Sequence, residues 1–224
     1  MPLRLREATV DDIPAMARVG VDAFENDELN LVLFPPAPDL TPDRHYADRL
    51  RFRAWITLDR MVKPGRITMV AVDDEKDGQI AGYAQWTKPA PPEGREPDPP
   101  AVSPEAAASV TFEREEFPPA FDKEKLPVYR AVSGAEERRV LGEDGTKNVW
   151  CLDILAVDPA CQGRGVGRML VQWGIEKAKA EGKGLYLCAT PTGKPFYSRL
   201  GLGLENVGAF ELWGIHGTSF VLRS

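Results

Sequence analysis

The first half of the chain begins with a pattern typical of a strand followed by helices. Apolar and charged residues alternate over residues 3–7, as in a short edge strand, and Thr9-Val-Asp-Asp then favours the start of a helix. Residues 25–39 mix acidic, amide and proline residues and predict a loop with one helical turn. A second, longer helix is predicted over residues 42–61, because one apolar stripe recurs there at Tyr46, Leu50, Ala54, Leu58 and Met61.

A β-hairpin and a long excursion follow these helices. Residues 67–72 and 79–86 are rich in β-branched and apolar residues, and Asp77-Gly78 between them favours a tight turn. Seven of the sixteen residues from Pro89 to Pro104 are proline, which excludes a central strand or a regular helix there. Helices are predicted next, over residues 105–117 and 121–142. We therefore expect an insertion at residues 87–147, placed between the third and fourth strands and able to cover a site.

The second half of the chain has the strongest pattern. Residues 149–157 form an apolar run with a single acid, which predicts a buried central strand. A glycine-rich turn and an amphipathic helix that ends near Gly182 follow it. Residues 185–189 predict another buried strand, residues 190–197 lead into a short helix, and residues 204–222 predict a last hairpin.

Composition and charge narrow the function. The chain has 224 residues and a formal net charge of −6, which disfavours nucleic acid as a partner. With three cysteines and two histidines far apart in the chain, neither a metal site nor a Ser-His-Asp triad has the residues it needs. We also find no signal-peptide pattern and no membrane-spanning apolar run, so the expected location is cytoplasmic and no membrane partner is expected.

The glycine-rich turn, Gln162-Gly-Arg-Gly-Val-Gly167, is the main candidate site. A strand that leads through glycines into a helix presents free backbone amides at the positive end of the helix dipole, which favours a phosphate. No Lys-Ser or Lys-Thr pair follows the glycines, which excludes a Walker A loop. Arg168 stands where the dinucleotide fingerprint needs its third glycine, so NAD is poorly supported.

Two segments together resemble the GCN5-related N-acetyltransferase (GNAT) family. Gln162-x-x-Gly165-x-Gly167 is similar to the family's pyrophosphate loop for acetyl-coenzyme A (acetyl-CoA). Pro195-Phe-Tyr197-Ser-Arg-Leu-Gly201-Leu is similar to the family's second signature. The chain departs from the family at Thr190, where Asn is frequent, and at Leu202, where an aromatic residue is common.

The resemblance implies a fold and a cosubstrate site. The fold is a single α/β domain over residues 1–224, in which helices flank a central, mostly antiparallel mixed sheet and residues 148–203 form the acetyl-CoA-binding core. Two central strands are expected to separate at a bulge and leave room for the cosubstrate. The implied acetyl-CoA-binding residues are Leu155, Ala156, Val157, Gln162, Gly163, Arg164, Gly165, Val166, Gly167, Arg168, Thr190 and Thr192.

Two residues are candidates for the chemistry. Tyr197 matches the family tyrosine that protonates the departing coenzyme A thiolate, and its alternative role is that of a core tyrosine. Asp153 is the single ionisable residue of the central strand, and simple alternation places it on one face with Cys151, Leu155 and Val157. It is predicted either as a base or water-holding group, or as half of a structural pair.

The sequence does not identify the acceptor of the acetyl group. The resemblance implies acetyl transfer to a primary amine, with no metal, and the acidic composition and the inserted segment favour the amine of a small molecule. Glu25, Asp27 and Glu28 are candidates for holding that amine, or are residues of a solvated loop. Acetylation of a protein or peptide is one alternative, and a non-catalytic acetyl-CoA-binding regulatory module is the other.

Overall fold

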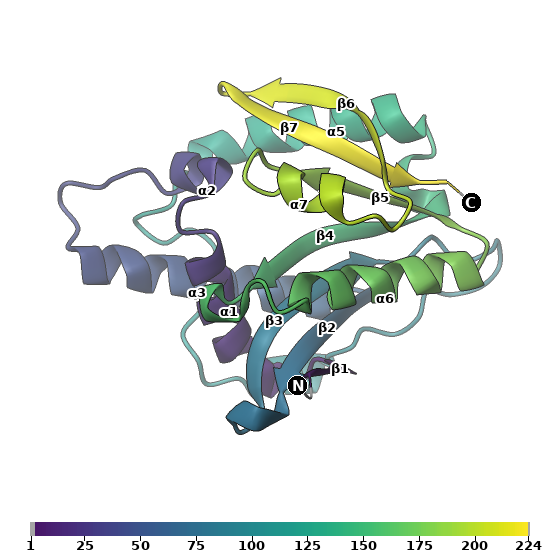
Figure 1. The fold of residues 1–224 in the computed structure, drawn as a ribbon. Coiled ribbons are helices and arrows are strands. Elements are labelled where there is room, and N and C mark those ends of the chain that lie inside the picture. Colours follow the sequence, from purple (N-terminus) through teal and green to yellow (C-terminus); the bar gives the residue numbers. More distant parts are fainter. Residues whose placement is uncertain (1–2, 224) are drawn as a thin grey trace.

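A computed structural model describes residues 3–223 and places one seven-stranded sheet at the centre of the molecule (Figure 1). The strand order is β1-β2-β3-β4-β5-β7-β6. Only β4 and β5 pair in parallel, and every other neighbouring pair is antiparallel. The strands are β1 (Leu3–Glu7), β2 (Arg66–Asp73), β3 (Gln79–Thr87), β4 (Val149–Val157), β5 (Gly184–Ala189), β6 (Glu205–Leu212) and β7 (Ile215–Leu222).

Helices cover both faces of this sheet. Two of them, α6 and α7, lie in front of the sheet in Figure 1, and α5 lies behind β5, β6 and β7. The helix α3 also packs on the face opposite α6, against α1 and the buried side chains of β2 and β3. The bounds are α1 (Ile13–Ala23), α2 (Glu28–Leu33), α3 (Pro42–Met61), α4 (Pro104–Ala108), α5 (Leu126–Leu141), α6 (Val166–Ala180) and α7 (Lys194–Arg199).

The predicted helix over residues 42–61 is confirmed at both ends. The Thr41 hydroxyl accepts a hydrogen bond of 3.3 Å from the Arg44 amide and caps the first turn, and Pro42 occupies the first helical position. The apolar stripe faces inward, and Ala54, Leu58 and Met61 are buried. Both predicted hairpins and the predicted central strand are also present.

The segment between β3 and β4 differs from the prediction in its helices. The helix predicted over residues 105–117 ends at Ala108, and the one predicted over residues 121–142 begins at Leu126. Pro118 and Pro119 disfavour a helix before them. The irregular chain instead bonds to α3, where Asp48 accepts from the Ala120 amide at 2.9 Å.

The cysteines differ in exposure. Cys161 is buried in the core with α6, beside the glycine turn. Cys188 of β5 keeps exposed surface. None of the helices within residues 3–223 has the length and apolar character of a membrane span.

Candidate functional site

The two parallel strands separate halfway along the sheet. β4 and β5 pair from Val149–Gly184 to Leu152–Leu187, and no later residue of β4 pairs with β5. A bulge occurs at the same place, because Gln85 of β3 pairs with Ile154 and Trp86 pairs with Leu152. The edge of β4 beyond Leu152 therefore has backbone groups free to bind an extended ligand.

The glycine turn lies next to this opening and leads into α6. Gly163 and Gly165 have φ angles of +74° and +86°, which favour glycine, and a Cβ added at either one would meet no atom within 4 Å. The first helical bond runs from the Met169 amide to the Gly165 carbonyl at 3.0 Å, so the preceding amides lack helical acceptors. This open arrangement fits the pyrophosphate of coenzyme A.

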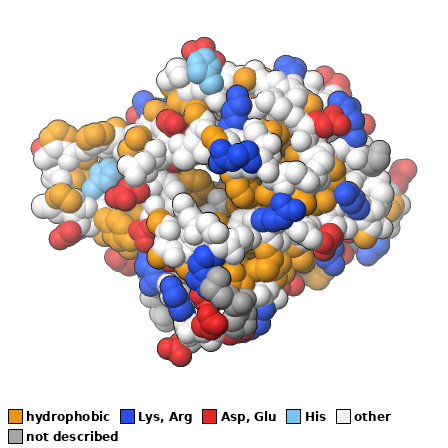
Figure 2. All heavy atoms as spheres, viewed as in Figure 1, with side chains coloured by type: hydrophobic (Ala, Val, Ile, Leu, Met, Phe, Trp, Pro, Cys, Tyr) orange, Lys and Arg blue, Asp and Glu red, His pale blue; other side chains and the backbone are white. Residues whose placement is uncertain are grey.

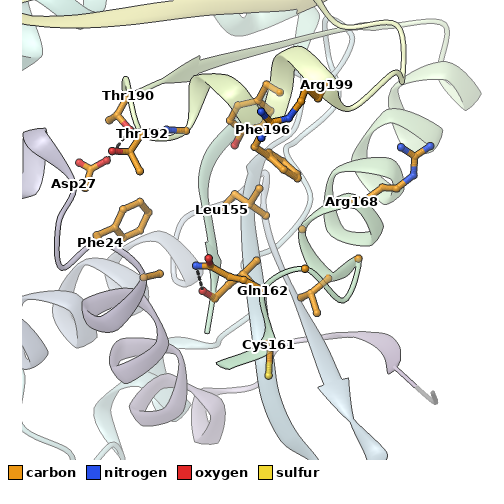
Figure 3. A pocket seen from close by; sticks show the side chains of 18 residues that line it. Phe24, Asp27, Leu155, Cys161, Gln162, Arg168, Thr190, Thr192, Phe196 and Arg199 are labelled. Carbon is orange, nitrogen blue, oxygen red and sulfur yellow. Dashed lines mark hydrogen bonds between the residues drawn. The ribbon is translucent and has the colours of Figure 1, made fainter. Parts of the chain in front are cut away.

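A cleft of about 490 Å³ joins the turn to the end of α1. Figure 2 shows the face hollowed near its centre, with Lys and Arg side chains above and beside the hollow. In Figure 3, Phe24 and Asp27 lie at one side of the cleft and Arg168 lies at the other. The lining residues are Ala23, Phe24, Asp27, Leu155, Val157, Cys161, Gln162, Gly163, Gly165, Val166, Gly167, Arg168, Thr190, Thr192, Gly193, Phe196, Tyr197 and Arg199.

Tyr197 lines this cleft from α7. Its ring packs edge-on against Phe196, with a centroid distance of 5.0 Å, and in a tilted arrangement against Phe220 of β7, with a centroid distance of 5.8 Å. Its hydroxyl has no hydrogen-bond partner within residues 3–223. Burial raises the pKa of Tyr197 well above its usual value near 10, so the phenol keeps its proton at neutral pH.

Asp27 provides a buried negative charge at the opposite end of the cleft. Its carboxylate caps α2, accepting from the amides of Leu29 at 3.1 Å and Asn30 at 3.2 Å. It also accepts from the Thr190 hydroxyl at 2.6 Å (Figure 3). No Lys, Arg or His of the described chain lies within 4 Å of it. The carboxylate is thus held by neutral donors and keeps its charge available to a ligand.

Asp153 does not line the cleft, and the alternation that placed it beside Leu155 and Val157 was wrong. The bulge shifts the alternation, so Leu155 and Val157 pack towards α6 while Asp153 lies on the other face. There its Oδ2 accepts from Arg66 at 2.6 Å and from the Thr87 hydroxyl at 2.7 Å. These contacts favour the structural pairing, one of the two roles that the sequence left open.

Most of the residues predicted to bind acetyl-CoA come together in the cleft. The exceptions are Ala156, which packs in the core beneath α1 and α3, and Arg164, which forms an ion pair with Asp73 at 2.7 Å. Of the three acids considered for the amine, Asp27 lines the cleft, Glu28 accepts from Thr192, and Glu25 is exposed. The roles of all these residues stay predictions.

Sequence reasoning did not select Phe24, Phe196 or Arg199 as lining residues. Phe196 directly precedes Tyr197 in the second signature, so the motif contained a signal for it. Phe24 directly follows α1, and no sequence motif indicated it as a lining residue, because its position depends on how α1 packs. Within residues 3–223 we find no group of three or more His, Cys, Asp or Glu side chains that could hold a metal ion.

Comparisons with solved structures give the same fold. A Corynebacterium glutamicum protein described as histone acetyltransferase HPA2 and related acetyltransferase is 22% identical, with a TM-score of 0.60 over 100% of this chain and 97% of that one. A mosquito arylalkylamine N-acetyltransferase like 5b is 18% identical, with a TM-score of 0.55 over 98% and 99%. PaiA N-acetyltransferase from Thermoplasma acidophilum, solved with coenzyme A, is 10% identical, with a TM-score of 0.55 and full coverage of both chains.

A search of curated proteins gives no match. A family model, in contrast, matches residues 29–202, which is more than half of the chain and includes the cleft-lining residues from Leu155 to Arg199. The model describes the acetyltransferase (GNAT) family. The separated central strands, the open glycine turn and this match agree, and the chain belongs to the GNAT family of acetyltransferases.

Proposed function

We propose that the protein transfers the acetyl group of acetyl-CoA to the primary amine of a small molecule by direct attack. Membership of the family makes the chain an acyltransferase, and acetyl-CoA is its cosubstrate. The observation that carries the choice of acceptor is Asp27, which is 5% exposed, lines the cleft and has no cationic partner within residues 3–223. A protonated amine is the partner that this charge favours.

The chain would hold the cosubstrate mainly through its backbone. Amides of residues 162–168 would bind the pyrophosphate at the start of α6. The unpaired edge of β4, at Leu155 and Val157, would bind the pantetheine arm like an added strand. Acetyl-CoA supplies a thioester, whose carbonyl carbon is open to attack by an amine.

Asp27 and Tyr197 provide for the proton movements of the reaction. The bound ammonium must lose a proton before it attacks, and the Asp27 carboxylate, directly or through water, is placed to accept it. A carbon–nitrogen bond then forms and the carbon–sulfur bond breaks. Tyr197 donates its hydroxyl proton to the departing thiolate, which leaves as the free thiol, and the proton that the nitrogen loses on becoming an amide returns to the Tyr197 phenolate.

A small acceptor agrees with how the segment between β3 and β4 packs. This segment covers α3 through a cluster of Phe34, Phe52 and Phe121, and its helix α5 packs on β5 and β7. Both contacts lie on the face of the sheet opposite α6. We infer that an acceptor approaches the opening between β4 and β5 from this face, where the segment would restrict access and favour a compact amine over an extended protein chain.

The test combines binding and turnover in one preparation. Calorimetric titration with acetyl-CoA, coenzyme A and ATP is followed by thiol release against a panel of small amines and a set of peptides. Selective acetyl-CoA binding with release for small amines supports the proposal. Release for peptides alone would make the protein a peptide acetyltransferase, and binding without release for any acceptor would make it a regulatory module.

A further inference from the structure

A group of arginine side chains lies under α3 with too few carboxylates to balance it. No Asp or Glu of residues 3–223 lies within 4 Å of Arg53 or Arg60. Arg60 donates one bond, of 3.3 Å, to the side-chain oxygen of Gln85. The Arg53 guanidinium lies 4.9 Å from the centre of the Phe24 ring, and its Nε is fully buried with no partner.

A buried tyrosine hydroxyl without a partner lies beside these arginines. The Tyr83 hydroxyl is fully buried and accepts or donates no hydrogen bond within the described chain. A Cβ at Gly20 would come within 2.6 Å of that hydroxyl and 2.9 Å of the Arg53 Cδ, so a glycine of α1 leaves the space for both. The charges of Arg60 and Asp153 also act on the hydroxyl of Tyr129 of α5.

The group of arginines has more positive than negative charge. Arg53, Arg60 and Arg66 provide three positive charges, and Asp153 provides one negative charge, most closely shared with Arg66 at 2.6 Å. The excess is therefore two positive charges, with burial lowering the pKa of Arg60. Holding unpaired charge away from water destabilises a protein, so such a group is favoured where an anion binds.

The group borders the acceptor end of the cleft. Phe24, which carries Arg53 on its ring, lines the cleft, and so does Asp27, whose charge also acts on the Tyr129 hydroxyl. In Figure 3, Phe24 and Asp27 lie on the same side of the cleft. Arg53 lies behind the Phe24 ring and not on the lining itself, so an acceptor whose amine approaches Asp27 would have to extend past Phe24 to reach the arginines.

We propose that the acceptor is an amine that also carries a carboxylate, and that Arg53 and Arg60 bind this carboxylate with help from the Tyr129 hydroxyl. This inference rests on the proposed function and names the class of its acceptor. A planar guanidinium suits a planar carboxylate, since two parallel hydrogen bonds can form between them. The acceptor is then bound at both ends, with its ammonium at Asp27 and its carboxylate under α3.

The test uses matched acceptors that differ in the charge at the carboxyl end and are chosen with the amine several carbon atoms away, so that the basicity of the amine stays similar. Each of a set of amino acids is compared with its own carboxamide for thiol release from acetyl-CoA. We expect kcat/KM for the acid to exceed that for the amide by about tenfold or more. Equal rates for acid and amide, or faster reaction of the amide, would overturn the inference while leaving the amine acetylation intact.

Variants locate the preference. Arg60→Gln is expected to remove the preference for acids by raising their KM, with acetyl-CoA binding unchanged. Arg44→Gln is the matched control, because Arg44 is exposed at the start of the same helix. Tyr129→Phe keeps the ring, and serves as a second variant if Arg60→Gln fails to fold. An acid preference that survives in both Arg60→Gln and Tyr129→Phe would overturn the assignment.

Direct binding separates this inference from the proposed function. If acetyl-CoA binds but no amine is acetylated, the proposed function fails. Calorimetry then measures the binding of the same acids and amides to the coenzyme A complex. Binding that is selective for the acids and is lost in Arg60→Gln supports the inference. Absent or unselective binding overturns the inference. Aminoalkylphosphonates are tested in the same way. If they bind more tightly than the carboxylates, the assignment of a carboxylate as the bound group is overturned.

Discussion

The Thr190 hydroxyl donates a 2.6 Å hydrogen bond to the Asp27 carboxylate, joining residues 163 positions apart in the chain. Thr190 follows β5, and Asp27 is the cap of α2, so the bond closes the acceptor end of the cleft. Because Asp27 is buried, each of its three neutral donors helps to offset the loss of solvating water. The same bond orients the Asp27 carboxylate, which we propose binds the amine of the acceptor.

Thr190→Val removes that donor and keeps the shape of the side chain. We expect the free energy of unfolding to fall by about 1–3 kcal/mol, the cost of leaving a buried acceptor less satisfied. The KM for the amine should rise, because the carboxylate is no longer oriented. Denaturant unfolding and amine kinetics measure the two effects. Thr190→Ser retains the hydroxyl and is the control, and a Val variant no different from it would contradict the role of the bond.

Tyr197→Phe tests the proposed proton donor. We expect kcat to fall by about 10²–10⁴ with acetyl-CoA affinity unchanged, because the variant loses a proton and keeps the ring packing. Since burial raises the pKa of Tyr197, the wild-type enzyme should show no loss of rate from tyrosine ionisation below about pH 10. The pH–rate profiles of both proteins measure this. Full turnover by the variant would remove Tyr197 from the mechanism.

The sequence predicted the elements with the strongest local signals. Residues 42–61 have a cap, a first-turn proline and a continuous stripe, and the helix is found with those bounds. The central strand over residues 149–157 was equally clear from its apolar run. The open backbone of the glycine turn was also predictable, because the positive φ angles at Gly163 and Gly165 depend on the local sequence.

Features that depend on tertiary contacts were not predictable from the chain alone. The alternation on β4 misplaced Asp153, because a bulge between two paired strands leaves no periodic signal in either one. The helix predicted over residues 105–117 ends at Ala108, and the chain beyond it bonds to α3 instead, from the Glu115 amide to the Arg51 carbonyl. Likewise, Asp27 could not be distinguished from Glu25 by residue type, and only packing buries one and exposes the other.

Two helix glycines give opposite predictions for the same substitution. A Cβ at Gly174 of α6 would lie 2.3 Å from the Trp86 ring, so Gly174→Ala forces the helix away from the sheet. We expect it to lower the free energy of unfolding by about 1–3 kcal/mol or more. At Gly134 of α5 the nearest atom would be 3.6 Å away, and Gly134→Ala should stabilise by about 0.5–1 kcal/mol through helix propensity. Denaturant midpoints compare the pair, and equal effects would contradict the close packing of α6 on Trp86.

Glu136 makes the attachment of α5 to the sheet sensitive to acid. Its buried carboxylate accepts from the Arg139 guanidinium at 2.7 Å and from the Ser219 hydroxyl of β7 at 2.6 Å. These bonds, the one from Arg139 first, hold the pKa of Glu136 below its usual value of 4.5. A depressed folded-state pKa stabilises the protein above the unfolded pKa, and that stability is lost as pH falls from 4.5 through the folded value.

Glu136→Gln should therefore flatten the dependence of unfolding free energy on pH below about 4.5, while destabilising the protein at neutral pH. Denaturant unfolding of wild type and variant across pH 3–7 measures both effects. Within residues 3–223, Glu137, the next residue, accepts only from the Thr146 amide, and Glu137→Gln is the matched control. If both variants show the wild-type slope on the acid side, the stabilising charge lies elsewhere. A flattened slope for Glu136→Gln alone would place the stabilising charge at the contact between α5 and β7.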